Sequence, residues 1–162
     1  IQGIGKVKAL QMSTYIEVTK RMMRPQRIQR IPFDAPRVVW QYLYPEMRSD
    51  TVERVWVLCL NRKNKLIRAE PVTSGTANRC LVHPREVFRP AIRHGASAVI
   101  LAHNHPSGDP SPSSGDLKAT KIIKVAAKQI GIEFHDHVII GEPEDDPRGK
   151  GYFSFYNAGR LD

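Results

Sequence analysis

The stretch that decides the fold is residues 98–116, AVILAHNHPSGDPSPSSGD. It opens with an unbroken apolar run at residues 98–102, typical of a strand buried on both faces of a sheet. Residues 106–115 are rich in proline, serine and glycine, and this composition predicts a loop. A helix is predicted over residues 116–130, and Gly131 is suited to end it. The stretch therefore predicts a strand, a loop and a helix in succession.

Side chains able to bind a metal stand where the predicted strand ends and where the helix begins. His103 and His105 are two residues apart, so both point to the same face of an extended segment. Pro106 disfavours a helical conformation at His105. Asp116 adds a carboxylate from the first turn of the helix. Two imidazoles and one carboxylate are typical of a catalytic zinc ion, whose fourth position is left to water. Zinc lowers the pKa of such a water to about 7.

The same residues allow a purely structural interpretation. Ser113 is suited to cap the helix, and Asp116 is suited to face the positive end of the helix dipole. The consecutive letters HNH at residues 103–105 do not indicate a ββα-metal nuclease, because that class takes its His, Asn and His from separated positions.

Strands and helices alternate along the rest of the chain. Apolar runs predict strands at residues 54–60, 66–73, near 81–82, 98–102, 133–140 and 152–156. Apolar stripes predict helices within residues 1–24, after Asp34, and at 84–94 and 116–130. Asp34 is expected to cap its helix, and Ile92 and Ile130 are expected to face the core. The alternation favours an α/β domain with a central sheet covered by helices.

Composition narrows the class of protein. The chain has 162 residues, enough for one compact unit with a short appendage, and its first residue is Ile, so a fragment of a longer protein is expected. Hydrophobic residues make up 41% and charged residues 25%, which excludes a disordered chain. The sequence has neither the apolar run of a membrane helix nor that of a signal peptide. Cys59 and Cys80 form no CxxC pair, which favours a cytoplasmic protein and a core role for both.

The net charge of +9 is unevenly distributed. Residues 1–50 carry +5, residues 51–100 carry +6 and residues 101–162 carry −2. A basic excess of this kind favours a polyanionic partner, nucleic acid first, although many soluble domains are basic without binding DNA.

The motif and the segments that follow it make the sequence resemble a known family. The H-x-H-x7-S-x2-D pattern of residues 103–116 matches the signature of the JAMM (MPN+, or JAB) zinc metalloproteases. The extended form HNHPSGDPSPSSGD, with DHVIIG at residues 136–141 and YFSF at 152–155, is similar to the RadC branch of that family. The resemblance runs from about Pro36 to Leu161. It implies a cytidine-deaminase-like α/β domain, a mixed sheet flanked by helices, over residues 34–162 and after a short helical segment.

The resemblance also implies a metal and its ligands. One Zn²⁺ per chain is expected on His103, His105 and Asp116, with water as the fourth ligand. Ser113 is implied to hydrogen-bond the developing oxyanion.

A general base is implied where the first helix of the domain gives way to its first strand. Glu53 stands there, and a carboxylate beside a metal-bound water is suited to shuttle a proton. Glu53 can equally be an ordinary exposed charge. Glu70 and Glu86 are rival acids, because each lies near the start of a strand or helix.

Other polar residues near the motif are expected to have lesser roles. Asn104 faces away from the metal by strand alternation and is given no catalytic role. Asp136 and His137 are candidates for supporting the site behind its ligands. His83 and His94 are expected at the surface or at helix ends.

The N-terminal segment is similar to the second half of a helix-hairpin-helix element, which RadC-like proteins carry ahead of this domain. We assign residues 1–24 to it and residues 25–33 to a basic linker. Gly3 and Gly5 would let backbone N–H groups approach a phosphate, and Lys6 and Lys8 add positive charge. The first helix of such an element is missing, so this is a weak indication of DNA binding.

Two hypotheses result. The first is a zinc hydrolase of the JAMM type that cleaves a peptide or isopeptide bond in an unidentified protein or peptide substrate. The second is a DNA-associated or partner-binding protein with an idle or weakly active zinc site, in keeping with the traditional description of RadC-like proteins as DNA repair proteins. The sequence leaves the oligomeric state open.

Overall fold

The computed structural model describes residues 5–23, 31–72 and 82–161. Its helices and strands are, in chain order, α1 (Lys6–Met23), α2 (Pro36–Met47), β1 (Val55–Leu60), β2 (Leu66–Val72), α3 (Pro84–Arg93), β3 (Ala98–Asn104), α4 (Ser114–Ile130), β4 (Glu133–Ile140) and β5 (Tyr152–Ser154).

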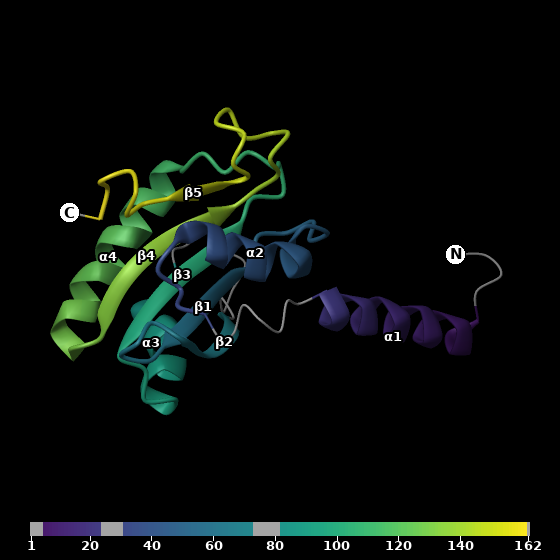
Figure 1. Ribbon diagram of the computed structural model, residues 1–162, viewed down its shortest axis with the longest axis horizontal. Helices are drawn as coiled ribbons and strands as arrows, with labels where there is room; N and C mark the ends of the chain where they lie inside the picture. The colour runs from purple at the N-terminus through teal and green to yellow at the C-terminus, as the bar shows by residue number, and fades with distance from the viewer. Residues whose placement is uncertain (1–4, 24–30, 73–81, 162) are drawn as a thin grey trace.

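The five strands form one mixed sheet in the order β2-β1-β3-β4-β5. β1 pairs antiparallel with β2 and β3, β3 pairs parallel with β4, and β4 pairs antiparallel with β5. α2 packs on one face of the sheet and α3 and α4 on the other (Figure 1). The predicted α/β domain with a mixed sheet flanked by helices is thereby confirmed.

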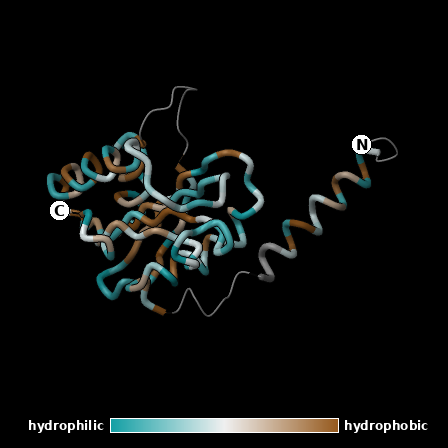
Figure 2. The backbone as a smooth tube through the Cα atoms, turned by 90° about the horizontal axis from the view of Figure 1, so that it is seen from above, coloured by the Kyte–Doolittle hydropathy of each residue, from teal (hydrophilic) through white to brown (hydrophobic). Residues whose placement is uncertain are grey.

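The core consists of two apolar layers, one on each face of the sheet. In β3, Ala102 lies in the layer beneath α2, whereas Leu101 lies in the layer beneath α3 and α4. In Figure 2 the hydrophobic segments gather in the strands at the middle of the domain. Because side chains alternate along a strand, β3 directs His103 to the side of α4 and Asn104 to the side of α2.

Both ends of α4 follow the predicted signals. Ser113 and Asp116 form a capping box, in which the side chain of each accepts a hydrogen bond from the backbone N–H of the other. At the other end Gly131 has φ +71°, a left-handed conformation that glycine adopts without strain. Asp116 is thereby held in the first turn of α4, next to the end of β3.

Two details of helix packing differ from the sequence prediction. Asp34 does not cap α2, because the N-cap is Ala35, directly before Pro36, and it makes no side-chain capping bond. Ile92 and Ile130 are 65% and 45% exposed and do not face the core. Both line an open apolar groove between α3 and α4.

Further predictions fall partly outside the described residues. Of the short strand expected near residues 81–82, Val82 lies in no strand and the rest is not described. Cys80 is also outside the described residues, whereas Cys59 is buried in the core as expected. Burial raises the pKa of the Cys59 thiol to about 11, so it stays protonated and inert.

The N-terminal helix α1 extends away from the sheet (Figure 1), and its large apolar side chains between Val7 and Val18 are exposed, Leu10 by 69%. Most of the proposed linker lies outside the described residues, but Phe33 at its end is buried in the layer beneath α2. Within residues 5–23, 31–72 and 82–161, no helix is long and apolar enough to cross a membrane.

Candidate metal centre

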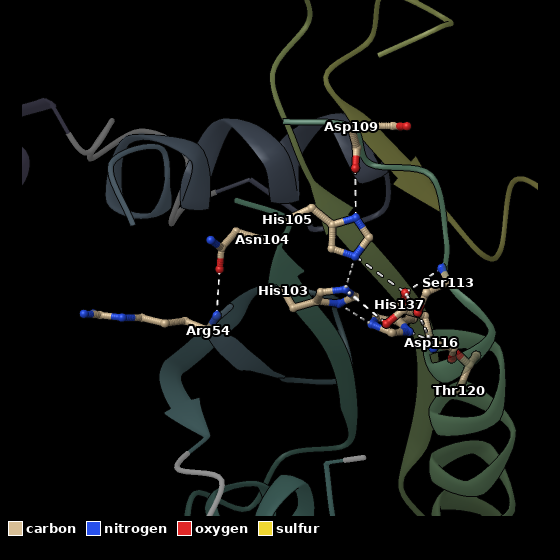
Figure 3. A network of polar contacts seen from close by, with 9 residues as sticks. All are labelled: Arg54, His103, Asn104, His105, Asp109, Ser113, Asp116, Thr120 and His137. Carbon is tan, nitrogen blue, oxygen red and sulfur yellow. Dashed lines mark hydrogen bonds and ion pairs between the residues drawn. The ribbon is translucent and has the colours of Figure 1, made fainter. Parts of the chain in front are cut away.

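The end of β3 and the start of α4 bring His103, His105 and Asp116 together (Figure 3). His103 lies within β3, and the backbone N–H of His105 donates to the carbonyl of Ile140, which continues the ladder between β3 and β4. Their ring atoms Nε2 are 3.1 Å apart. Oδ1 of Asp116 is 3.2 Å from Nε2 of His103, and Oδ2 is 3.6 Å from Nε2 of His105. The structure thus places the three predicted ligands around one point.

This spacing fits a tetrahedral zinc ion. Ligand atoms that stand about 2.0–2.2 Å from zinc at tetrahedral angles are about 3.3–3.6 Å from one another. The two Nε2 atoms are 3.1 Å apart, and one oxygen of Asp116 lies 3.2 Å from His103 while its other oxygen lies 3.6 Å from His105, all close to these values. The donors, two imidazole nitrogens and one carboxylate, are also of the kind that zinc prefers. The group can therefore hold a metal ion.

A hydrogen bond fixes the tautomer of His105. Its Nδ1 lies 2.8 Å from the backbone carbonyl of Asp109 (Figure 3). Because a carbonyl only accepts, Nδ1 carries the hydrogen and the lone pair of Nε2 is directed at the other ligands. Gly108, with φ +84°, turns the loop so that this carbonyl reaches the ring. The loop that separates the ligands in sequence thus also orients one of them.

The carboxylate of Asp116 is ionised. Burial alone would raise the pKa of Asp116, but its close contacts with His103, His105 and Ser113 outweigh burial and lower the pKa below its ordinary value. For His105, burial acts to lower the pKa, but Asp116, the Asp109 carbonyl and the charge of Glu53 together raise it. Among the three candidate ligands, Asp116 therefore supplies the negative charge.

Ser113 has the capping role that the structural interpretation gave it. Its Oγ lies 3.2 Å from the backbone nitrogen of Asp116 and 2.6 Å from Oδ2 of the same residue. The Ser113 side chain is therefore next to a ligand as well as at the helix end, so the structural and functional interpretations apply together. Its role toward an oxyanion stays a prediction.

Glu53 lies two residues before the start of β1, and β1 is the strand that pairs antiparallel with β3. Val55 pairs with His103, so continuing the antiparallel register by two residues puts Glu53 opposite His105. The negative charge of Glu53 also contributes to the pKa of His105. Glu53 is exposed, and its role as a base stays a prediction.

Asn104 faces away from the ligands, as predicted, but it has a structural role that the sequence reasoning missed. Its side chain is buried, and Oδ1 accepts a hydrogen bond of 2.7 Å from the backbone N–H of Arg54 (Figure 3). Its Nδ2 donates to the carbonyl of Val52 over 3.1 Å. These two bonds hold the backbone on either side of Glu53. No local sequence signal reveals this contact, since the partners are about 50 residues apart.

The rival acids are engaged elsewhere. Glu70, on β2, contacts His94 over 2.7 Å and forms ion pairs with Arg68 and Arg93. Its strand is separated from β3 by β1. Glu86, on α3, pairs with neighbouring arginines of that helix. The geometry thus favours Glu53 over both.

The other histidines divide as expected. His83 caps the start of α3, where its ring accepts a hydrogen bond from the backbone N–H of Arg85, and His94 is the C-cap of the same helix. His137 contacts the ligand His103 over 2.9 Å. Asp136 instead accepts hydrogen bonds from Ser154, from Tyr156 and from the backbone of His137.

An open cavity of about 130 Å³ adjoins the candidate ligands. Tyr44 and Arg48, at the end of α2, form one wall, and the loop from His105 to Gly108 forms another. The side chain of Arg48 lies over the Tyr44 ring, 5.3 Å from its centroid. The cavity gives a small group access to the side of His105.

The residues proposed for nucleic-acid binding lie far from this centre in the sequence. Gly3 is outside the described residues, and Gly5 directly precedes α1. Lys6 and Lys8, in the first turn of α1, are exposed. Their binding role stays a prediction.

Comparison with known proteins matches residues 33–160 to a family described as the RadC-like JAB domain. A UPF0758 protein of Chlorobium phaeovibrioides is 42% identical over 159 residues, which are 98% of this chain and 68% of that protein. A UPF0758 protein of Thermotoga maritima is 42% identical over 162 residues, 99% of this chain and 69% of the relative. A third, from Methanosarcina barkeri, is 39% identical over 142 residues, 88% of this chain and 62% of the relative.

These relatives extend beyond the chain, which spans about two thirds of their length. The matched residues contain all five strands, α2, α3 and α4, and the His103–His105–Asp116 group. By its fold, its site and these matches, the chain belongs to the RadC-like JAB domain family.

Proposed function

We propose that this protein is a zinc-dependent hydrolase of the JAMM type that cleaves a peptide or isopeptide bond. The observation that carries the proposal is the convergence of His103, His105 and Asp116, whose ligand atoms all lie within 4.8 Å of one another and are of the kind that zinc prefers. One zinc ion per chain would supply Lewis acidity there and lower the pKa of a bound water to about 7. The family match supports this reaction class.

Glu53 is the proposed general base. Its place opposite His105 and the two hydrogen bonds of Asn104 on either side of it support this assignment. The carboxylate would take a proton from the attacking water as the new carbon–oxygen bond forms. It would then give that proton to the leaving nitrogen as the carbon–nitrogen bond breaks, which yields a carboxylic acid and an amine.

Ser113 is the proposed donor to the developing oxyanion. Its hydroxyl has one hydrogen, and at 2.6 Å from Oδ2 that hydrogen faces Asp116. To act on a substrate, the hydroxyl must rotate toward the carbonyl oxygen. The cavity beside His105 is the proposed place for the substrate segment next to the scissile bond.

The decisive experiment is a peptide and isopeptide library screen with the zinc-loaded protein, its Glu53→Gln variant and a matched control, Glu133→Gln. Glu133 is an exposed residue at the start of β4, whereas the site lies at the ends of β3 and β4. Wild type and Glu133→Gln should cleave the same substrates, whereas Glu53→Gln should keep about one zinc per chain and lose cleavage.

Two results would contradict the proposal in different ways. A wild-type protein that binds no zinc has no metal centre of this kind. Cleavage retained in Glu53→Gln would leave the metal centre standing and exclude Glu53 as the base.

Association with DNA is the alternative that we propose for the basic part of the chain. It is supported by the positive charge of residues 1–100, whose formal net charge is +11. The exposed Lys6 and Lys8 of α1 contribute to that charge.

A further inference from the structure

A chain of three hydrogen bonds runs from the ligand His103 through the protein to the ligand Asp116 (Figure 3). Nδ1 of His103 lies 2.9 Å from Nε2 of His137, on β4. Nδ1 of His137 lies 2.7 Å from Oγ1 of Thr120, on α4. The Thr120 hydroxyl in turn lies 2.7 Å from the backbone carbonyl of Asp116. No sequence signal singled out Thr120, although it lies one helical turn after Asp116.

The last group in this chain fixes the direction of every hydrogen bond before it. A carbonyl only accepts, so the single hydroxyl hydrogen of Thr120 points to Asp116, a bond to the residue four positions earlier that helices commonly allow. The Thr120 oxygen must then accept from His137, which places a hydrogen on Nδ1 of that ring. Nε2 of neutral His137 is left to accept from Nδ1 of His103.

We propose that His137 is a positioning residue that, with Thr120, holds His103 in the tautomer required for metal binding. With its hydrogen on Nδ1, His103 has a free lone pair on Nε2, the atom 3.2 Å from Asp116 and 3.1 Å from His105. The opposite tautomer would carry a hydrogen on Nε2, and that atom could then not bind a metal. The inference rests on the proposed metal centre, but the direction of the hydrogen bonds can be tested without it.

The surroundings of His137 leave the ring little freedom. It is buried, and its backbone pairs with Leu101 of β3. One face of the ring stacks on Phe155, with the centroids 4.8 Å apart and the planes inclined by 11°. The chain of bonds therefore ties a ligand from β3 to the helix that carries Asp116, and it limits how far the two can separate.

A second histidine is an uncommon partner for a ligating histidine, which usually donates to a carboxylate, a backbone carbonyl or water. An imidazole can donate or accept, so it needs another group to fix its hydrogen, and Thr120 is that group. A neutral partner also adds no negative charge to a site in which Asp116 is the one acidic ligand. Zinc held there would keep more of its positive charge than beside a second carboxylate.

The test uses four variants in two matched pairs. His137→Phe keeps an aromatic ring of similar size against Phe155 but cannot accept, whereas His137→Gln offers a carbonyl oxygen to His103 and an N–H to Thr120. Thr120→Val removes the hydroxyl and keeps the shape, whereas Thr120→Ser keeps the hydroxyl. Zinc affinity is measured by competition with a chelator, and nitrogen-15 NMR of the metal-free proteins reports the tautomer of each histidine.

We expect zinc to bind roughly 10- to 100-fold more weakly to His137→Phe, the range usual for removal of such a partner. His137→Gln and Thr120→Ser should bind within a few fold of wild type, and Thr120→Val should fall between. In the wild type, NMR should find the hydrogen on Nδ1 of both His103 and His137. In Thr120→Val, His137 should become a mixture of tautomers.

The proposal is overturned if the metal-free wild type carries hydrogen on Nε2 of His137 or lacks hydrogen on Nδ1 of His103, or if both His137→Phe and Thr120→Val bind zinc like wild type. A wild type that shows the expected tautomers but binds no zinc would instead refute the proposed function. If His137→Phe does not fold, Thr120→Val and the NMR of the wild type still decide the matter.

Discussion

The hydrogen bonds of Asn104 give a prediction whose size can be worked out from the structure. Replacing Asn104 by leucine keeps the approximate volume but removes the bonds of 2.7 and 3.1 Å to the backbone around Glu53. A hydrogen bond of this kind contributes about 1 kcal/mol to stability. Asn104→Leu should therefore lower the free energy of unfolding by about 2 kcal/mol, measured in urea.

The effect on Glu53 is more specific than the loss of stability. Without Asn104 the backbone N–H of Arg54 loses its acceptor, so hydrogen exchange at this amide should accelerate. Exchange in the central strands should change only as much as the loss of global stability requires. Displacing a catalytic group by about 1 Å can cost on the order of 100-fold in rate. We expect a loss of that order in kcat for Asn104→Leu, with the zinc content unchanged.

Asn61 offers a matched control. Its Oδ1 also accepts from two backbone N–H groups, those of Lys63 and Lys65, in the turn between β1 and β2. Asn61→Leu should cost a comparable amount of stability without affecting exchange at Arg54 or kcat. The reasoning is refuted if Asn104→Leu leaves the Arg54 amide protected, or if the two variants slow the reaction equally.

Three further predictions concern single groups. Ser113→Ala should lower the free energy of unfolding by about 1 kcal/mol and Ser113→Gly by only a few tenths. If the Ser113 hydroxyl also binds the oxyanion, kcat should fall equally in both variants. A fall in kcat that instead follows the loss of stability would exclude that role. Burial raises the pKa of Asp136 from 3.8 to about 6, so the folded state binds more protons than the unfolded state between these values. Stability should then fall as the pH rises from about 4 to 6, by up to about 3 kcal/mol, and denaturation of Asp136→Asn should lack this slope. If α1 binds duplex DNA, replacing Lys6 and Lys8 by glutamate should weaken binding in fluorescence anisotropy and reduce its logarithmic salt dependence by about 2, whereas binding insensitive to salt would contradict an electrostatic contact.

The sequence alone predicted the α/β fold class and a candidate ligand set. The ligand set depends on short-range rules: the apolar run of β3 predicts a buried strand, alternation puts His103 and His105 on one face, and the capping residues Ser113 and Asp116 start α4 at Ser114. The fold class also needed the alternation of strands and helices along the rest of the chain. Packing at helix ends was less predictable, because Ile92 and Ile130 fit an apolar stripe yet line an open groove.

The residues that surround these candidate ligands depend on the tertiary structure. The antiparallel pairing of β1 with β3 brings Glu53, just before β1, near enough for its charge to act on His105, and the same sheet places Glu70 on a more distant strand. His137 reaches His103 across the parallel pair β3 and β4, from 34 residues along the chain. Strand pairing brings such residues together over sequence distances at which no local periodicity connects them. For this reason the candidate ligands and the candidate base Glu53 could be predicted from a motif and a family resemblance, whereas the groups that position them required the fold.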